Sequence, residues 1–176
     1  YMSGIINATN LEVENIKNTS GTTYNFIKQI KQVQFLGHYN FNDSTYQDIS
    51  NGGEALTVAI TPNSASSKIL VKCVLCASAN SNQRFGVRIV RDGSMIFTPT
   101  SLSNRTAAHV FGNGGGSNIP TPPSVIELLD EPSSTSSLTY KVQAHCESSS
   151  YLYINQCQTW SDDFTKFGAV STLTVM

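Results

Sequence analysis

The residues best suited to chemistry are two cysteines, Cys73 and Cys76, in the stretch KILVKCVLCASAN. A C-x-x-C spacing can bind zinc or form a redox dithiol when it lies on a turn or at the start of a helix. Here the flanking residues are apolar and include no turn former, which indicates a strand. Because side chains alternate between the faces of a strand, we expect Cys73 to point inward and Cys76 outward, so that one metal ion cannot bind both.

The other two cysteines, Cys146 and Cys157, give no clear pair. If residues 147–150 close a hairpin, the two sulfur atoms lie roughly 20 Å apart along it, which is beyond the reach of a disulfide. A long-range bridge from Cys73 stays open, and four free thiols would fit folding in a reducing cytoplasm. The histidines lack a second metal ligand at a suitable spacing, so we expect them at surface or interface positions. They are His38, His109 and His145.

Motifs of catalysis are absent, since the sequence has no G-x-S-x-G, no H-E-x-x-H and no P-loop. The run Gly114-Gly115-Gly116 is followed by prolines and no helix, which indicates a surface loop rather than a phosphate site. A glycosidase pair assembled in space stays open. The carboxylates that we considered are Asp43, Asp48, Asp130, Glu131, Asp162 and Asp163.

The last four of these acids are predicted to lie in turns, and calcium at 162–163 has no supporting ligand periodicity. Tyr151, Tyr153 and Trp160 are candidates for contact with a sugar or a protein, although strand aromatics commonly face a core. The sequence therefore predicts no catalytic, cofactor-binding or metal-binding residue, no cofactor and no enzyme activity.

Composition narrows the classes of partner. The chain has 176 residues and a formal net charge of −1, and only 13% of its residues are charged, so bulk electrostatics do not favour nucleic acid or an anionic membrane. No apolar stretch is long enough to span a bilayer, and no signal peptide is visible. The Tyr before the first Met indicates a fragment, a processed product or the ordered part of something longer. Abundant uncharged polar residues suit extracellular or virion β proteins.

From residue 31 onward the sequence reads as short strands separated by turn residues. These strands must position the candidate side chains named above. Asp92-Gly93 is a strong signal for a two-residue hairpin, and ESSS at 147–150 suggests another. Without helical periodicity between strands, the chain is predicted to be all-β, an antiparallel jelly-roll sandwich. Inward positions follow from alternation: Leu56, Val58, Ile60, Ile69, Val71, Cys73, Leu75, Ala77, Phe85, Val87, Ile89, Tyr140, Val142, Ala144 and Cys146.

Two units are expected along the chain. Residues 1–30 have scattered apolar positions and no capped amphipathic run, which predicts either a short extended stem or connector that gains a core only with partner chains, or a floppy terminus. Residues 31–176 form the jelly-roll domain. On its outward face, Leu70, Val74 and Cys76 are apolar enough to predict that another subunit covers them.

A resemblance to bacteriophage proteins follows from ITPNSASSKILVKC, EPSSTSSLTYKVQAH, YINQ and STLTVM. These stretches resemble a domain of tail-fibre and other phage virion proteins over about 31–176, and NLEVENIKNTSGTT is similar to their connectors. The strand order also resembles the trimeric jelly rolls of tumour necrosis factor and complement globular heads. The loop SNRTAAHVFGNGGGSNIPTPPS departs from this pattern.

The resemblance implies a non-enzymatic phage virion protein, a homotrimeric fibre or capsid-decoration protein assembled in the host cytoplasm. Its stem would bind other virion proteins, and its head would contact a host-surface glycan or protein or neighbouring subunits, without binding nucleic acid or inserting into a membrane. Recognition is expected at 39–54, 99–123 or 147–150, through Asn, Ser and Thr hydrogen bonds and aromatic stacking. The alternative is a cellular carbohydrate-binding jelly roll, with a signal peptide and disulfides.

Overall fold

The computed structural model describes residues 20–21, 27–80, 83–100, 103–114, 122–147, 151–157 and 168–176, which include strands and no helix. The strands are β1 (Lys31–Phe35), β2 (Tyr39–Phe41), β3 (Gln47–Asp48), β4 (Ser50–Asn51), β5 (Glu54–Ala55), β6 (Thr57–Ile60), β7 (Ile69–Leu75), β8 (Ala77–Ala79), β9 (Arg84–Arg91), β10 (Ser94–Met95), β11 (Val110–Asn113), β12 (Ser124–Asp130), β13 (Leu138–Cys146), β14 (Leu152–Ile154) and β15 (Ser171–Val175).

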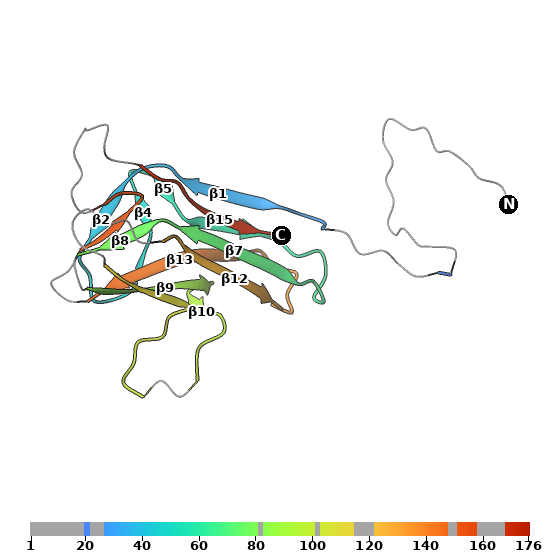
Figure 1. The fold of residues 1–176 in the computed structure, drawn as a ribbon. Helices are drawn as coiled ribbons and strands as arrows, with labels where there is room; N and C mark the ends of the chain where they lie inside the picture. The colour runs from blue at the N-terminus through green and yellow to red at the C-terminus, as the bar shows by residue number, and fades with distance from the viewer. Residues whose placement is uncertain are drawn as a thin grey trace.

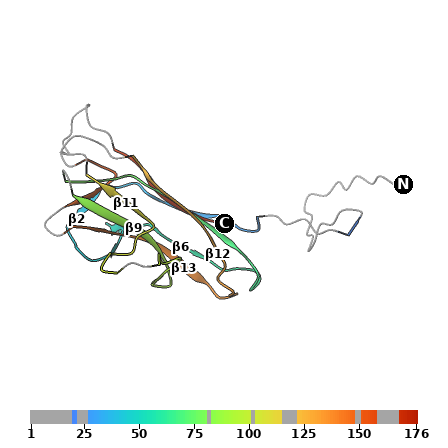
Figure 2. The same cartoon turned by 60° about the horizontal axis from the view of Figure 1, so that its bottom comes forward.

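Eight of these strands form two facing antiparallel sheets (Figure 1). One sheet has the order β1-β15-β7-β12, and the other has the order β6-β13-β9-β11. Figure 2 shows the strands of the second sheet together on one side of the molecule. Counted along the chain from one to eight, these strands have the order 1-8-3-6 in the first sheet and 2-7-4-5 in the second. This is the strand order of a jelly roll, and it confirms the predicted all-β sandwich.

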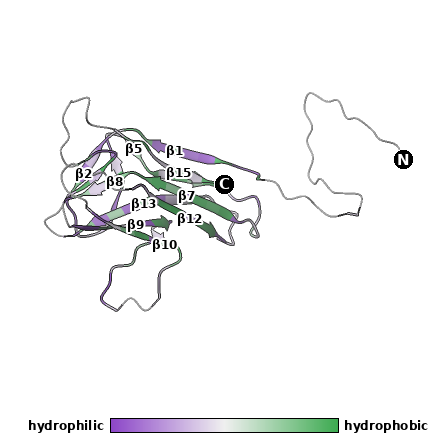
Figure 3. Ribbon diagram, viewed as in Figure 1, coloured by the Kyte–Doolittle hydropathy of each residue, from purple (hydrophilic) through white to green (hydrophobic). Residues whose placement is uncertain are grey.

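The core lies between the two sheets and follows the predicted alternation. All the inward positions predicted from the sequence are at most 8% exposed. Figure 3 shows that β7 and β12 are mainly hydrophobic, whereas the edge strand β1 is mainly hydrophilic. Apolar burial of this extent is the dominant force that holds two sheets face to face.

The last strand of the jelly roll is interrupted. β14 pairs with β2 and β8, and β15 pairs with β1 and β7, so both segments occupy the same position between the first and third strands. The predicted hairpin between 138–146 and 151–159 is therefore wrong, because β13 pairs with β9, β6 and β3 instead. The ESSS segment connects two different sheets, and a sequence cannot distinguish such a crossing from a hairpin by its turn residues alone.

Asn155 closes the interruption between β14 and β15. Its side-chain amide donates hydrogen bonds to the carbonyls of Phe35 (2.7 Å) and Gly37 (2.9 Å), and its Oδ1 accepts one from the Ser171 hydroxyl (2.7 Å). Its backbone N–H bonds to the Cys76 carbonyl at 2.8 Å. The residue is 2% exposed and has a φ of 59°, a left-handed conformation that Asn tolerates better than most residues.

A second interruption places the β4–β5 hairpin beside the sandwich. β3 and β6 both pair with β13, and the chain between them leaves the sheet after Ile49 and returns at Leu56. Val142 holds both ends, since its N–H donates to the Leu56 carbonyl and its own carbonyl accepts from the Ile49 N–H. The predicted Asp92-Gly93 turn is confirmed between β9 and β10, with φ values of 49° and 85°.

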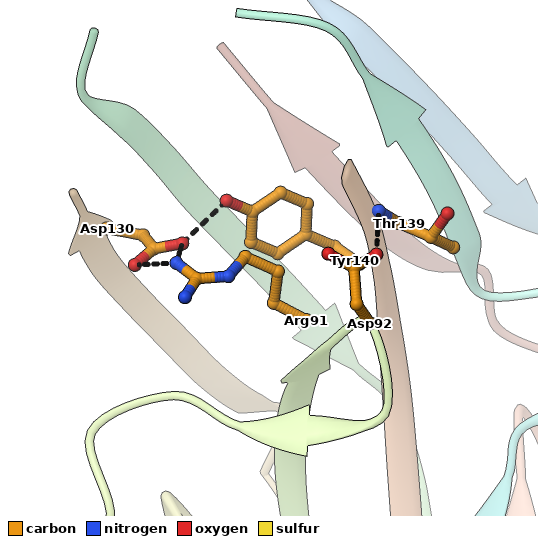
Figure 4. Close-up of polar contacts among 5 residues, drawn as sticks. All are labelled: Arg91, Asp92, Asp130, Thr139 and Tyr140. Carbon is orange, nitrogen blue, oxygen red and sulfur yellow. Dashed lines mark hydrogen bonds and ion pairs between the residues drawn. The ribbon is translucent and has the colours of Figure 1, made fainter. Parts of the chain in front are cut away.

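Asp130 joins the two sheets (Figure 4). It ends β12 in one sheet, and both of its carboxylate oxygens accept hydrogen bonds from Nη1 of Arg91 in the other, at 2.7 and 2.6 Å. The hydroxyl of Tyr140, which lies opposite Arg91 in the β9–β13 register, donates at 2.6 Å. Asp130 is 5% exposed, so its assignment as a turn acid is wrong; the apolar residues before it belong to a strand that continues through it.

The segment before β1 is fixed at one end of the sandwich, where the Gln29 side chain donates hydrogen bonds to the Thr61 carbonyl and to Asn63. Residues 1–19 and 22–26, most of the predicted stem, lie outside the described residues, so the division at residue 30 stays a prediction. The residues that the structure describes include no helix long and apolar enough to cross a bilayer.

Candidate functional site

A polar groove of about 710 Å³ lies at the end of the sandwich opposite the segment 27–30. Its volume is in the range of small-ligand sites. We call it the tip groove, and it is lined by Tyr39, Asn40, Phe41, Asn42, Asp43, Tyr46, Gln47, Asp48, Ser50, Gln143 and Tyr151.

Asp43 is fixed by its own turn. One carboxylate oxygen accepts hydrogen bonds from the backbone N–H and the hydroxyl of Thr45, both at 2.7 Å, and the other accepts one from Gln47 at 2.8 Å. The bonds from Thr45 lower the pKa of Asp43, with a smaller effect from Gln47. The backbone is held by the Cys146 N–H, which donates to the Asp43 carbonyl. Asp43 is therefore a preorganised, ionised hydrogen-bond acceptor at neutral pH.

Asp48 is held from the adjacent strand β13. Lys141 and Gln143 each donate to its carboxylate at 2.7 Å. Burial raises the pKa of Asp48, but these bonds and the Lys141 charge lower it overall. The network continues outward, since Gln143 accepts a 2.8 Å bond from Arg88, whose guanidinium lies 3.9 Å from the centre of the Tyr46 ring. The groove floor is thus a connected polar surface with few free rotamers.

Aromatic rings stand at the side of the groove. Tyr151 is 42% exposed and stacks on Tyr153, with ring centres 6.2 Å apart and planes at 29°. Tyr153 is 9% exposed, and its hydroxyl donates to Asn80 at 3.1 Å. The sequence left open whether these aromatic residues contact a ligand or face the core. In the structure Tyr151 faces solvent, and Tyr153 is buried beneath it. Trp160 lies outside the described residues.

The chemistry of the groove suits binding. Both carboxylates have lowered pKa values, so neither holds a proton at neutral pH as a general acid would need to do. Each carboxylate is also hydrogen-bonded to neighbouring side chains, which fixes its position. The arrangement offers oriented acceptors, exposed amides and an aromatic ring, and it provides no argument for hydrolysis of a bound ligand.

Of the three segments predicted to carry recognition, 39–54 contributes most of the tip groove. In 99–123, residues 101–102 and 115–121 lie outside the described residues, as do 148–150 and both Asp162 and Asp163. Gln143 lines the groove, although no sequence pattern indicated it. Period-two alternation along β13 placed its inward face correctly and left Gln143 on the opposite face, but only the pairing of β3 with β13 brings it beside Asp48.

The predicted inward position of Cys73 is confirmed, whereas Cys76 lies just after the end of β7 and not on its outward face. The predicted separation of Cys146 and Cys157 rested on the hairpin that the strand pairing contradicts. Cys73 is fully buried, and burial raises the pKa of its thiol to about 12, which makes it unreactive. Cys76 is half-buried. No disulfide joins any two of the four cysteines. Among the described residues no group of three or more His, Cys, Asp or Glu side chains is placed to bind a metal.

Two further residues have structural positions. His109 is half-buried at the edge of β9, where its Nδ1 accepts a 2.9 Å bond from the Ile89 N–H and its Nε2 faces the Ile96 carbonyl. Its role is thus to fill a gap between β10 and β11 rather than to meet solvent. Gly114 is buried against the carbonyls of Ala79 and Asn80, so close that a side chain would overlap them. That glycine is a packed contact and not part of an open loop.

Comparisons with known proteins give distant structural likeness only. No family model and no curated protein sequence matches the chain. Two structures are similar over 94% of this chain and 42% of theirs, both with a TM-score of 0.35: infectious bursal disease virus Gt strain, at 11% identity, and the infectious bursal disease virus VP2 subviral particle, at 10% identity. The chain thus spans less than half of those proteins, and a likeness this weak carries no functional argument.

Proposed function

We propose that the chain is a non-enzymatic structural protein of a bacteriophage virion, a trimeric fibre or decoration protein whose jelly-roll head contacts the host surface or neighbouring subunits. The observation that carries this proposal is the coincidence of the phage-like sequence motifs with the elements that define the fold. ITPNSASSKILVKC covers the connection from β6 into β7, and STLTVM covers β15. The Asn of YINQ is Asn155, which closes the interrupted strand.

The outer face of the β1-β15-β7-β12 sheet supports the trimer. Val125 and Leu129 on β12 are 56% and 50% exposed, and in the β7 register they lie beside the half-buried Val74 and Leu70. Between these apolar rows Lys72 pairs with Glu127 at 3.4 Å, so the face has no net charge from this pair. An exposed apolar sheet face of this kind favours contact with another protein surface. The predicted cover over Leu70 and Val74 would be a second and third copy.

Mass spectrometry of purified virions together with sedimentation of the isolated protein tests the proposal. We expect the chain among the virion proteins and a trimer in solution. A monomer that is absent from virions would overturn both parts.

A cellular carbohydrate-binding jelly roll is the second candidate, because the tip groove has side chains suited to sugars. It predicts secretion and disulfides. Alkylation of the denatured, unreduced protein distinguishes the candidates. Four modified thiols favour the virion protein, and two or none favour the secreted one.

A further inference from the structure

We propose that the tip groove binds a neutral saccharide, with one sugar ring against Tyr151 and its hydroxyls bonded to Asp43, Asp48 and the surrounding amides. The inference deepens the proposed function and rests on its host-contact role, because it names the chemical class of the surface ligand.

The acceptors favour hydroxyl groups. An ionised carboxylate only accepts hydrogen bonds, and a sugar presents several O–H donors on one face. Asp43 is held by its own turn and Asp48 by the adjacent strand β13, so little conformational entropy is lost when a ligand binds them. Around them Asn40, Asn42 and Ser50 are exposed and offer both donors and acceptors. A ligand rich in hydroxyls matches this lining better than an apolar one.

The charge of the groove selects against acidic ligands. The two carboxylates that line it face one ammonium group, that of Lys141, which is already paired with Asp48 at 2.7 Å. Arg88 is bonded to Gln143 and lies against the Tyr46 ring, but like Lys141 it is not among the lining residues. A sulfate, phosphate or sialic acid would therefore meet two carboxylates and no cationic side chain among the residues that line the groove. Uncharged sugars avoid that repulsion and still use the carboxylates as acceptors.

Tyr151 provides the surface for stacking. Its contact with Tyr153 holds the ring in place at 6.2 Å, and 42% of the residue remains exposed. The π face of an aromatic ring is negative and apolar, so it attracts the weakly positive C–H face of a pyranose ring. Because the ring is already ordered by its neighbour, stacking a sugar on it costs little rotamer freedom.

The position of the groove suits contact with a surface outside the particle. Residues 27–30 join the sandwich at the opposite end, beside Thr61 and Asn63. In Figure 1 the strands that bear the groove, β2 and β4, lie at the end away from the start of β1. A head attached through its N-terminal segment would thus present the groove outward.

Titration of the isotope-labelled 176-residue chain with methyl glycosides of glucose, galactose, mannose and N-acetylglucosamine, followed by amide chemical shifts, tests the inference. N-acetylneuraminic acid is the anionic comparison. We expect at least one neutral glycoside to shift the amides of Asn40, Gln143 and Tyr151 saturably, and the acidic sugar to bind more weakly. Tyr151→Ala should weaken binding roughly tenfold or more, as expected when an aromatic stacking contact is lost.

Phe111→Ala is the matched control, because Phe111 is 81% exposed on β11 and lies outside the groove lining. It should leave binding unchanged. If Tyr151→Ala lowers the thermal midpoint, Asn40→Ala on the exposed side of β2 replaces it. Tighter binding of the acidic sugar, shifts confined to another surface, equal effects of both variants, or no saturable response to any neutral glycoside would overturn the inference. The presence of the chain in virions is measured separately and does not depend on these results.

Discussion

At the scale of single residues, Asp130 shows how one carboxylate can fasten two sheets. It accepts bonds from Arg91 and Tyr140, both in the opposite sheet, and it is almost completely buried. Asp130→Asn keeps the shape but removes the charge, and it leaves the Arg91 guanidinium, 30% exposed, without its partner. We expect unfolding free energy to fall by about 2–3 kcal/mol, less than for a fully buried pair because Arg91 reaches water. Urea denaturation measures it.

Glu131→Gln is the matched control one residue further along the chain. Glu131 pairs with Lys68 at 2.7 Å, but the two side chains are 62% and 58% exposed. Solvent screening makes such a pair worth roughly 0–1 kcal/mol, so the substitution should change the urea midpoint little. Equal losses for the two variants would show that the bond between the sheets is not what stabilises this region.

His109 predicts a pH dependence of stability. Its Nδ1 accepts a bond from the Ile89 N–H, which requires a neutral ring. Burial lowers the pKa of His109 below the ordinary 6.5; the bond to the Ile96 carbonyl opposes this, and the Arg88 charge adds a smaller lowering effect. Between the folded and unfolded pKa values the unfolded chain binds more protons. The stability that the neutral His109 ring contributes is therefore fully present above pH 6.5, and it is lost as the pH falls through the pKa of His109 in the folded protein.

The comparison that isolates this effect is wild type against His109→Gln in urea at pH 7.5 and at more acidic pH. We expect the stability advantage of the wild-type protein to shrink on acidification, because Gln does not titrate. An advantage that stays constant across that range would mean that the histidine contributes by packing and not through its neutral ring.

At the scale of elements, Asn155 determines whether the interrupted strand keeps its register. Asn155→Ala removes the donors to the Phe35 and Gly37 carbonyls, leaves the Ser171 hydroxyl without its acceptor and forces Ala into a left-handed conformation. Lost buried bonds of this number predict a loss of about 2–4 kcal/mol. Thermal and urea unfolding measure it, with Asn40→Ala on the exposed side of β2 as control. A loss no larger than that of the control would contradict the role of Asn155.

The elements also show how far sequence reasoning reaches. Period-two alternation predicted the inward faces of β7, β9 and β13, since each strand has a regular pleat, although Gly86 and Val90 on the opposite face of β9 are buried as well. The Asp92-Gly93 turn was predictable because its geometry is local. The connection after β13 was not, because a crossing between sheets and a hairpin have the same turn residues. Asp130 and the tip groove depend on pairing between distant strands, which no local pattern encodes.

At the scale of the whole molecule, the outer face of the β1-β15-β7-β12 sheet is the feature that the single chain leaves unexplained. Val125 and Leu129 stay half-exposed on an edge strand, where natural sheets commonly carry charges that prevent association. The presence of apolar side chains at these positions, in place of charged ones, is consistent with an obligatory contact. In a trimer each exposed residue occurs three times, so that small changes per chain multiply across the assembly.

Replacing Val125 and Leu129 together with lysine should therefore dissociate the proposed trimer. Each new ammonium group would have to leave water on association, at a cost that exceeds the apolar contact it replaces. Leu36→Lys with Phe97→Lys is the matched control, since these residues are 59% and 56% exposed and lie outside this sheet face. Sedimentation equilibrium should give a trimer for the wild type and the control and a monomer for the first variant. Two variants that dissociate alike would place the interface elsewhere, and a monomeric wild type would remove the trimer from the proposal.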